Sequence, residues 1–208
     1  LDDGPGITVE SRVLSDQEGY DLPGLTLSLA NGQQIRGKAR LSPSPEQNFL
    51  DLILSGNGIT LATAAANLPV RDWTALLPGA VADLGGLGLR FDISAQDLSL
   101  RNGTGIERLT VAGALTAADG LRLRSLRAKT DAAVSFDLDR LIVAGSDELE
   151  FAGRITADDP SRLISDPDRA ELARSLGRLN FEGEVELIDG ALAVTSGRVE
   201  TNQGGFSV

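Results

Sequence analysis

The 208-residue sequence contains no histidine, no cysteine and no methionine. Without His or Cys, the chain cannot supply the usual zinc ligands, a Cys nucleophile or a Ser-His-Asp triad. General acid–base catalysis would fall to Asp, Glu, Lys or Tyr, which need burial or special neighbours to titrate near neutral pH. The absence of disulfides fits either a reducing compartment or an envelope protein that manages without them. We therefore expect a protein that is not an enzyme and holds no metal or cofactor.

Aromatic residues make up only 4% of the chain. The sequence contains no run of 18 apolar residues, which is about the length that a bilayer-spanning helix needs. Hydrophobic residues still make up 41% of the chain, enough to build a core mainly from Leu, Val, Ile and Ala. Basic residues are few, 19 against 30 acidic ones, whereas a duplex or an anionic membrane surface attracts clustered Lys and Arg. The densest basic stretch alternates with leucines, which is typical of a solvated strand face: Arg122, Arg124, Arg127 and Lys129. We expect no nucleic-acid partner.

The dominant pattern in the sequence is alternation of apolar and polar residues. Successive side chains of a strand point to opposite faces, so each alternating run predicts a strand with one apolar face. The apolar members are Leu25-Leu27-Leu29, Leu50-Leu52-Leu54, Leu87-Leu89-Phe91-Ile93, Leu98-Leu100, Leu121-Leu123, Val134-Phe136-Leu138, Leu141-Val143, Val185-Leu187 and Leu192-Val194. The pattern predicts an all-β chain.

Five dipeptides suit the positive-φ positions of hairpin turns. They are Asn31-Gly32, Asn57-Gly58, Asn102-Gly103, Asp119-Gly120 and Asp189-Gly190. Asp189-Gly190 is the clearest case, with Val185-Glu186-Leu187 before it and Leu192-Ala193-Val194 after it. We therefore expect an antiparallel meander.

Two stretches lose the alternation and predict short helices near 64–82 and 160–177. The first includes Trp73, and we expect a short helix or two there, bounded by Pro69 and Pro78. The second opens with an acidic cap followed by Pro160, and Gly177 is placed to end it. Pro167 is expected to divide this second stretch into two helices.

The chain begins at Leu1 instead of Met and ends in a sequence that looks like the opening of another strand. We therefore interpret residues 1–208 as a single β-rich repeat segment of a larger protein, with weak sub-boundaries near 62–86 and 158–178. Any membrane anchor of the parent protein would lie elsewhere in its chain.

Short repeats of the form apolar-x-Gly-x-apolar recur at 111–115, 151–155 and 181–185. In addition, Phe91, Phe136 and Phe181 are spaced 45 residues apart, each followed by Asp or Glu. Degenerate repetition of this kind indicates an elongated sheet built from similar units. Chance similarity between β-strands of simple composition is the alternative.

Two groups of acidic residues need a chemical interpretation. Asp158, Asp159, Asp166 and Asp168 could hold a hard cation such as calcium, but helix capping explains the first pair directly. Asp92, Asp137 and Asp139 could be paired carboxylates for glycoside hydrolysis. Because Asp137 and Asp139 alternate with Phe136 and Leu138, we expect them to face solvent instead.

Three stretches carry a resemblance to a known family. The strand 89–100 (LRFDISAQDLSL), the hairpin 183–194 (GEVELIDGALAV) and the interrupting DPSRLI at 159–164 resemble the periplasmic repeats of AsmA-like envelope proteins, including TamB-type relatives. The resemblance covers residues 45–208 and concerns general strand texture, since the family has no active-site motif to transfer. It implies a curved, trough-like, mainly antiparallel sheet in the periplasm, belonging to a protein anchored in the inner membrane.

The resemblance also implies lipid handling: transport of phospholipid between membranes, or a role in outer-membrane assembly with envelope partners that the sequence does not identify. An apolar face of a curved sheet could be covered by acyl chains, which gain about 0.8 kcal/mol per buried methylene. Twelve residues are candidates for this lining: Phe91, Leu98, Leu100, Leu115, Leu123, Phe136, Leu138, Val143, Phe151, Val185, Leu187 and Leu192. The alternatives are an ordinary packed core and, for the whole segment, a structural β-solenoid or adhesin-like scaffold without a lipid groove.

Overall fold

The fold is taken from a computed structural model of the chain. It describes residues 8–29, 31–43, 47–61, 87–100, 105–131, 133–144, 148–163, 167–188 and 191–208. The predicted helix near 64–82, including Trp73, and the dipeptides Asn102-Gly103 and Asp189-Gly190 lie outside these residues.

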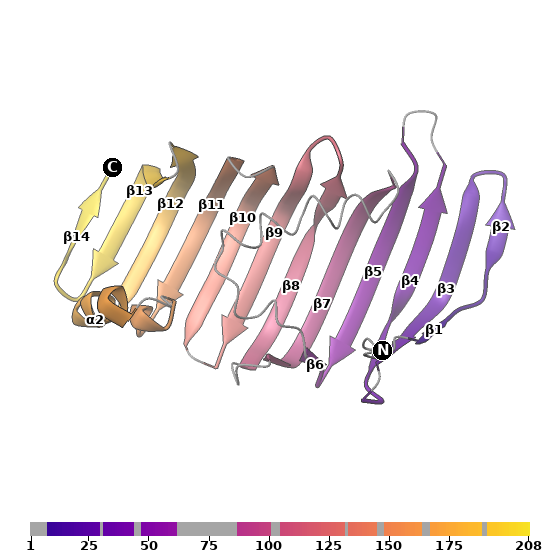
Figure 1. The fold of residues 1–208 in the computed structure, drawn as a ribbon, viewed down its shortest axis with the longest axis horizontal. Helices are drawn as coiled ribbons and strands as arrows, with labels where there is room; N and C mark the ends of the chain where they lie inside the picture. Colours follow the sequence, from indigo (N-terminus) through magenta and orange to yellow (C-terminus); the bar gives the residue numbers. More distant parts are fainter. Residues whose placement is uncertain are drawn as a thin grey trace, which may run out of the picture.

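The described residues form one open sheet of fourteen strands with two short helices (Figure 1). The elements are β1 (Thr8–Glu10), β2 (Leu14–Asp16), β3 (Gly19–Ser28), β4 (Gln34–Ser42), β5 (Phe49–Asn57), β6 (Thr60–Leu61), β7 (Gly88–Leu100), β8 (Gly105–Thr116), β9 (Gly120–Thr130), β10 (Val134–Ala144), β11 (Glu148–Ala157), η2 (Pro160–Leu163), α2 (Pro167–Ser175), β12 (Leu179–Ile188), β13 (Ala191–Thr201) and β14 (Gly204–Ser207). From β3 to β14 the longer strands follow sequence order, while β1 and β2 both pair with β3 and β6 pairs with β7. The predicted all-β, elongated and mainly antiparallel fold is confirmed.

Strands β5 and β7 pair in parallel, which interrupts the meander. A parallel pair needs a crossover connection and cannot be joined by a hairpin turn. The prediction that Asn57-Gly58 forms a hairpin is therefore wrong, although Gly58 does have a positive φ of 62°. It leads into β6, which also runs parallel to β7. The turns predicted at Asn31-Gly32 and Asp119-Gly120 are confirmed, with Gly32 at φ 82° and Gly120 at φ 67°.

A continuous row of apolar residues and glycines, here called the central row, crosses ten neighbouring strands. Side chains of paired residues lie on the same face, so the row defines an apolar face of the sheet. Its members, from β3 to β13, are Leu25, Gly37, Leu54, Ile93, Val111, Leu126, Leu138, Gly153, Gly183 and Gly197.

The adjacent row lies on the opposite face and is polar at every position. It crosses twelve strands through Glu10, Thr26, Arg36, Ser55, Ser94, Thr110, Arg127, Asp137, Arg154, Glu182, Arg198 and Ser207. We call this side the polar face. One apolar and one polar face are what strict alternation in an antiparallel sheet predicts.

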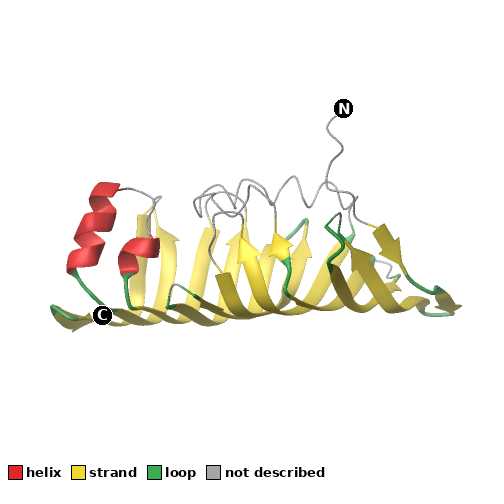
Figure 2. Cartoon of the chain, turned by 90° about the horizontal axis from the view of Figure 1, so that it is seen from below, coloured by secondary structure: helices red, strands yellow, loops and turns green. Residues whose placement is uncertain are grey.

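Four of the five register shifts between the described strands lie beside the central row, and the fifth, at Ile106/Arg108, lies nearer the start of β8. The register shifts after Leu22, at Ala112/Gly113, after Leu138 and at Glu184/Val185. A β-bulge bends its strand and increases the local twist. Bulges aligned across the sheet bend it along one line, and Figure 2 shows the sheet curving toward the side that carries the helices.

The last three positions of the central row are glycines with positive φ: Gly153 (142°), Gly183 (157°) and Gly197 (139°). A Cβ at Gly183 would overlap the carbonyl of Ser196, and one at Gly197 would overlap the carbonyl of Glu182. The strands β11, β12 and β13 therefore approach too closely here for any other residue. Two of these glycines, Gly153 and Gly183, are the central residues of the repeated apolar-x-Gly-x-apolar motif.

The second helical stretch forms as predicted. Asp159 accepts hydrogen bonds from the backbone N–H (3.1 Å) and the hydroxyl (2.5 Å) of Ser161, which caps η2. Pro167 begins α2, and Gly177, at φ 68°, follows its end. The carbonyl of Leu176 accepts a hydrogen bond from Asn202 N–H (3.1 Å), which ties the helix to the turn between β13 and β14.

The repeat-like arrangement of strands is present, but the 45-residue spacing of phenylalanines is not a structural period. Phe91 lies on β7, Phe136 on β10 and Phe181 on β12. The first interval thus advances three strands and the second only two, because the second also contains η2 and α2. All three rings nevertheless lie on the apolar face.

Candidate functional site: the apolar face of the sheet

Strand pairing brings most of the predicted lining residues to one face. Leu115 pairs with Leu121, which pairs with Val143, and Phe151 pairs with Val185 and Leu141. Following such pairs places nine candidates on the apolar face directly: Phe91, Leu115, Leu123, Phe136, Leu138, Val143, Phe151, Val185 and Leu187. The structure does not describe the side chains of the other two candidates on this list, Leu100 and Leu192.

Leu98 reaches the same face by an irregularity. It packs in a cluster with Ala95 and Ile59, although residues three apart on a regular strand point to opposite faces. Asp97, between them, has a φ of 51°, which shifts the alternation by one residue. Leu98 is therefore only 4% exposed, and its cluster also contacts Leu29, Ile35, Ile106 and Leu109.

The candidates differ in burial. Leu98, Leu115, Leu123, Leu138, Val143 and Val185 are buried, whereas Phe91, Phe136, Phe151 and Leu187 are half-buried. The apolar face thus combines well-packed positions with others that retain accessible surface.

The lining prediction started at β7 and missed the part of the apolar face on β3, β4 and β5. There the face is formed by residues such as Leu25, Leu27, Leu50, Leu52 and Leu54. The same two-residue alternation identifies them, so the signal was present in the sequence. Phe181 and Val199, which are paired on β12 and β13, were also missed.

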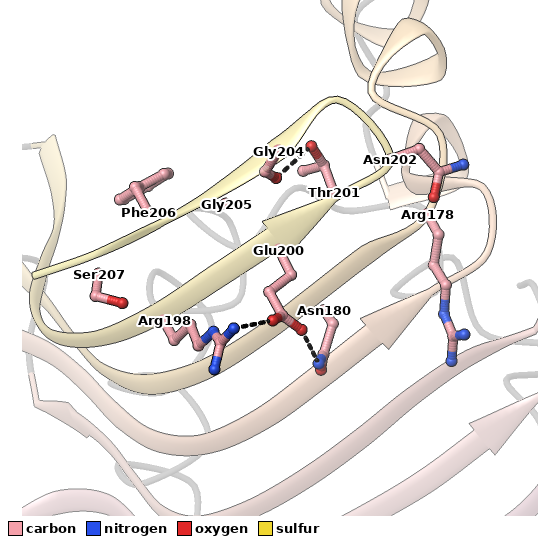
Figure 3. A pocket seen from close by; sticks show the side chains of 10 residues that line it. All are labelled: Arg178, Asn180, Arg198, Glu200, Thr201, Asn202, Gly204, Gly205, Phe206 and Ser207. Carbon is pink, nitrogen blue, oxygen red and sulfur yellow. Dashed lines mark hydrogen bonds and ion pairs between the residues drawn. The ribbon is translucent and has the colours of Figure 1, made fainter.

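Three surface hollows are lined mainly by groups of the polar face or of the sheet edge. The largest, about 610 Å³, lies along β13 and β14 and is lined by Arg178, Asn180, Arg198, Glu200, Thr201, Asn202 and residues 204–207 (Figure 3). Another, about 440 Å³, lies over Gly153 and Gly183, and a third, about 380 Å³, lies near Leu14, Pro23 and Ile53.

In the largest hollow, Glu200 accepts hydrogen bonds from two polar-face neighbours. Its carboxylate bonds to Arg198 (2.6 Å) and to the Asn180 amide nitrogen (3.2 Å), as Figure 3 shows. The Asn180 Oδ1 atom is buried and has no hydrogen-bond partner in the described part of the chain.

Charges on the polar face neutralise one another across strands. In the polar row, Arg127 bonds to Asp137 (2.8 Å) and Arg154 to Glu182 (2.7 Å). The hydrogen bond and charge of Glu182 raise the pKa of Arg154 above its usual value. These pairs are exposed, and exposed pairs contribute little to stability. The basic stretch 122–129 is part of this solvated face, as predicted.

Most of the acidic residues singled out in the sequence are paired with basic residues or cap a helix. Asp137 and Asp139 both contact Arg127, and Asp92 contacts Arg124, all with exposed carboxylates. Asp158 pairs with Arg178 (3.5 Å), while Asp159 caps η2. Asp166 and the Asp168 side chain are not described. Among the side chains that are, no group of three or more His, Cys, Asp or Glu could hold a metal ion.

Within the described part of the chain, no helix is both long enough and apolar enough to cross a membrane. The strongest candidate for a functional surface is the apolar face, where the strand pairing gathers nine of the twelve predicted lining residues directly. Comparison with protein-family models, with curated proteins and with solved structures finds no match to this chain.

Proposed function

We propose that the apolar face binds the acyl chains of phospholipids, and that this segment contributes to lipid transport or outer-membrane assembly in a bacterial envelope. The observation that carries the proposal is the central row, in which ten neighbouring strands each place an apolar side chain or a glycine on the same face. A sheet with such a face is stabilised when something apolar covers it.

Two further features support a lipid. The sheet is open, so its apolar face is not closed on itself as in a barrel. Half-buried residues such as Phe91, Phe136 and Leu187 retain apolar surface that an acyl chain could cover. Burial of each methylene there would contribute about 0.8 kcal/mol. The resemblance to AsmA-like repeats supports a periplasmic location and a parent protein anchored in the inner membrane.

A structural β-scaffold is the alternative, and the burial pattern favours it at particular positions. Leu138 is only 5% exposed and Val185 only 6%, so these side chains already pack against the protein. On this alternative, the apolar face is an ordinary core and any binding takes place on the polar side, where the three hollows lie.

Lipid loading of a matched pair of variants tests the proposal. Leu187→Asp places a charge on the apolar face, and Ile53→Asp places the same charge at a 48% exposed position on the polar face. After gentle purification, mass spectrometry should detect phospholipid bound to the wild type and to Ile53→Asp. Leu187→Asp should bind none while keeping the circular dichroism spectrum of a folded sheet.

Three outcomes would contradict lipid binding. The first is a wild type without lipid that also fails to take up a fluorescent phospholipid. The second is equal loading of the two variants. The third is unfolding of Leu187→Asp and of a second variant, Phe136→Asp, which would show that these half-buried positions belong to a packed core and would favour the scaffold.

A further inference from the structure

Charge is not spread evenly over the polar face. The described strands β1–β3 carry three acidic residues and no basic one, β4–β9 carry nine basic and four acidic residues, and β10–β14 carry three basic and eight acidic residues. The net charge is nine minus four, or +5, on the middle strands and three minus eight, or −5, on the last ones. Most of these charges lie on the polar face, because they alternate with apolar neighbours. A chain with an overall charge of −11 thus has a basic band, on β4–β9, between two acidic bands.

Within the basic band, one stretch of two adjacent rows contains no carboxylate. From β4 to β9 the polar row consists of Arg36, Ser55, Ser94, Thr110 and Arg127. The next row, two residues along each strand, consists of Asn57, Gln96, Arg108 and Lys129. All nine side chains can donate hydrogen bonds, and we call them the donor track. Acidic residues mark its limits: Glu10 and Asp137 in the polar row, and Asp97 and Glu107 beside the second row.

Three cations of the basic band have no carboxylate partner in the described part of the chain: Arg36, Lys38 and Arg108. All three are exposed, and Arg36 bonds only to the neutral side chain of Gln34 (3.1 Å). Arg36 and Lys38 stand two residues apart on β4, which is about 7 Å, and β8, with Arg108, lies three strand spacings or about 14 Å from β4. The other six basic residues of the band each contact a carboxylate.

The neutral members of the donor track are also available to a ligand. Among the described residues, Asn57, Ser94, Gln96 and Thr110 have no side-chain hydrogen bond, and Ser55 bonds only to the Arg36 carbonyl at a long 3.4 Å. Hydroxyl and amide side chains both donate and accept hydrogen bonds. The donor track therefore combines unpaired cations with neutral groups that can bond to hydroxyls.

We propose that the donor track, together with Lys38, binds an acidic polysaccharide that lies across the strands from β4 to β8. Its anionic groups bond to Arg36, Lys38 and Arg108, and its hydroxyls bond to the serine, threonine and amide side chains between these cations. Hydrogen bonds between a guanidinium and an anionic oxygen are about twice as strong as neutral ones. The proposal does not rest on lipid binding, because it concerns the opposite face of the sheet.

Two features favour a polysaccharide over other polyanions. No member of the donor track is aromatic, whereas proteins hold single-stranded nucleic acid by stacking its bases on aromatic rings. A flat anionic membrane would meet the acidic bands as well as the basic one and would be repelled there. A single narrow chain stays within the basic band.

Binding of a fluorescein-labelled oligogalacturonate, a carboxylated sugar chain, tests the proposal by fluorescence anisotropy. At physiological ionic strength, charges more than about 8 Å from the ligand are largely screened. The triple variant Arg36→Gln, Lys38→Gln, Arg108→Gln breaks no ion pair of the described residues and should weaken binding at least about tenfold. An uncharged maltooligosaccharide should not bind the wild type.

The matched control makes the same change in charge on the same face, but in the acidic band: Arg140→Gln, Arg154→Gln and Arg198→Gln together. It should bind the oligogalacturonate as the wild type does, and circular dichroism should show both triple variants folded. Equal losses in the two triple variants would overturn the proposal, because binding would then depend only on net charge.

Replacement of neutral donors tests the position of the ligand without a change in charge. Ser94→Ala with Thr110→Val should weaken binding about tenfold through two lost hydrogen bonds. Ser207→Ala, in the polar row outside the donor track, is the control and should have no effect. A wild type that does not bind the oligogalacturonate would overturn the proposal. Tighter binding of a thymidine oligonucleotide, or of vesicles containing phosphatidylglycerol, would also overturn it and would assign the basic band to nucleic acid or to a membrane.

Discussion

The rings of Phe151 and Phe181 meet edge to face, with centroids 6.0 Å apart and planes at 74°. Each ring stands two residues before a glycine, and those glycines, Gly153 and Gly183, pair with each other on neighbouring strands. The contact between the rings therefore crosses the glycine pair on the apolar face. Aromatic side chains that cover glycines on a neighbouring strand compensate for the missing packing. The repeated apolar-x-Gly-x-apolar motif encodes both parts of this arrangement.

The two rings should be energetically coupled. Phe181→Ala should lower the free energy of unfolding by about 3–5 kcal/mol, and Phe151→Ala by less because its ring is half-buried. Urea unfolding of both single variants and the double variant should give a coupling of about 0.5–1.5 kcal/mol. A second cycle, Phe181 with the distant Phe91, should be additive within error. Additivity of the first cycle would mean that the rings do not stabilise each other.

Gly183→Ala should be more damaging than Gly24→Ala. Both glycines have positive φ, 157° and 67°, but a Cβ at Gly183 would overlap the Ser196 carbonyl, while a Cβ at Gly24 would contact nothing within 4 Å. Backbone strain alone costs about 1–3 kcal/mol, so Gly183→Ala should exceed that range and Gly24→Ala should remain within it. Thermal unfolding of the two variants would check this. Equal losses would show that strands β12 and β13 can separate to accept a methyl group.

Asp97 should tolerate glycine but not valine. At a φ of 51°, a β-branched residue is strained by about 1–2 kcal/mol, whereas glycine is not. Asp97→Val should lower the midpoint of urea unfolding, and Asp97→Gly should leave it unchanged or raise it. Gln96→Val, at the neighbouring exposed position of regular strand, serves as the control and should cause no loss. If Asp97→Val matched this control, the bulge would not depend on the left-handed conformation.

Alternation was enough to predict the strands and to assign most residues to a face. For example, Phe136 and Leu138 could be placed on one face, and Asp137 and Asp139 in solvent, because side-chain direction along a strand depends only on local backbone geometry. The roles of Asp159, which caps η2, and of Gly177, which follows the end of α2, could be predicted for the same reason, because each involves only residues nearby in the sequence. Local hydrogen bonding and allowed φ angles are sufficient for such positions.

The parallel pairing of β5 with β7 could not be predicted, since Asn57-Gly58 looks the same before a hairpin and before a crossover. The position of Leu98 on the apolar face depends on the bulge at Asp97. One residue with a positive φ moves every later side chain of the strand to the opposite face from the one that simple alternation predicts. Leu25 and Gly197 occupy opposite ends of the central row although 172 positions separate them in the chain. Period-two alternation in the sequence by itself determined that this chain would form a sheet with one apolar and one polar face. Only the tertiary structure decided the strand order and the bend along the glycines, because these depend on pairing between residues far apart in sequence.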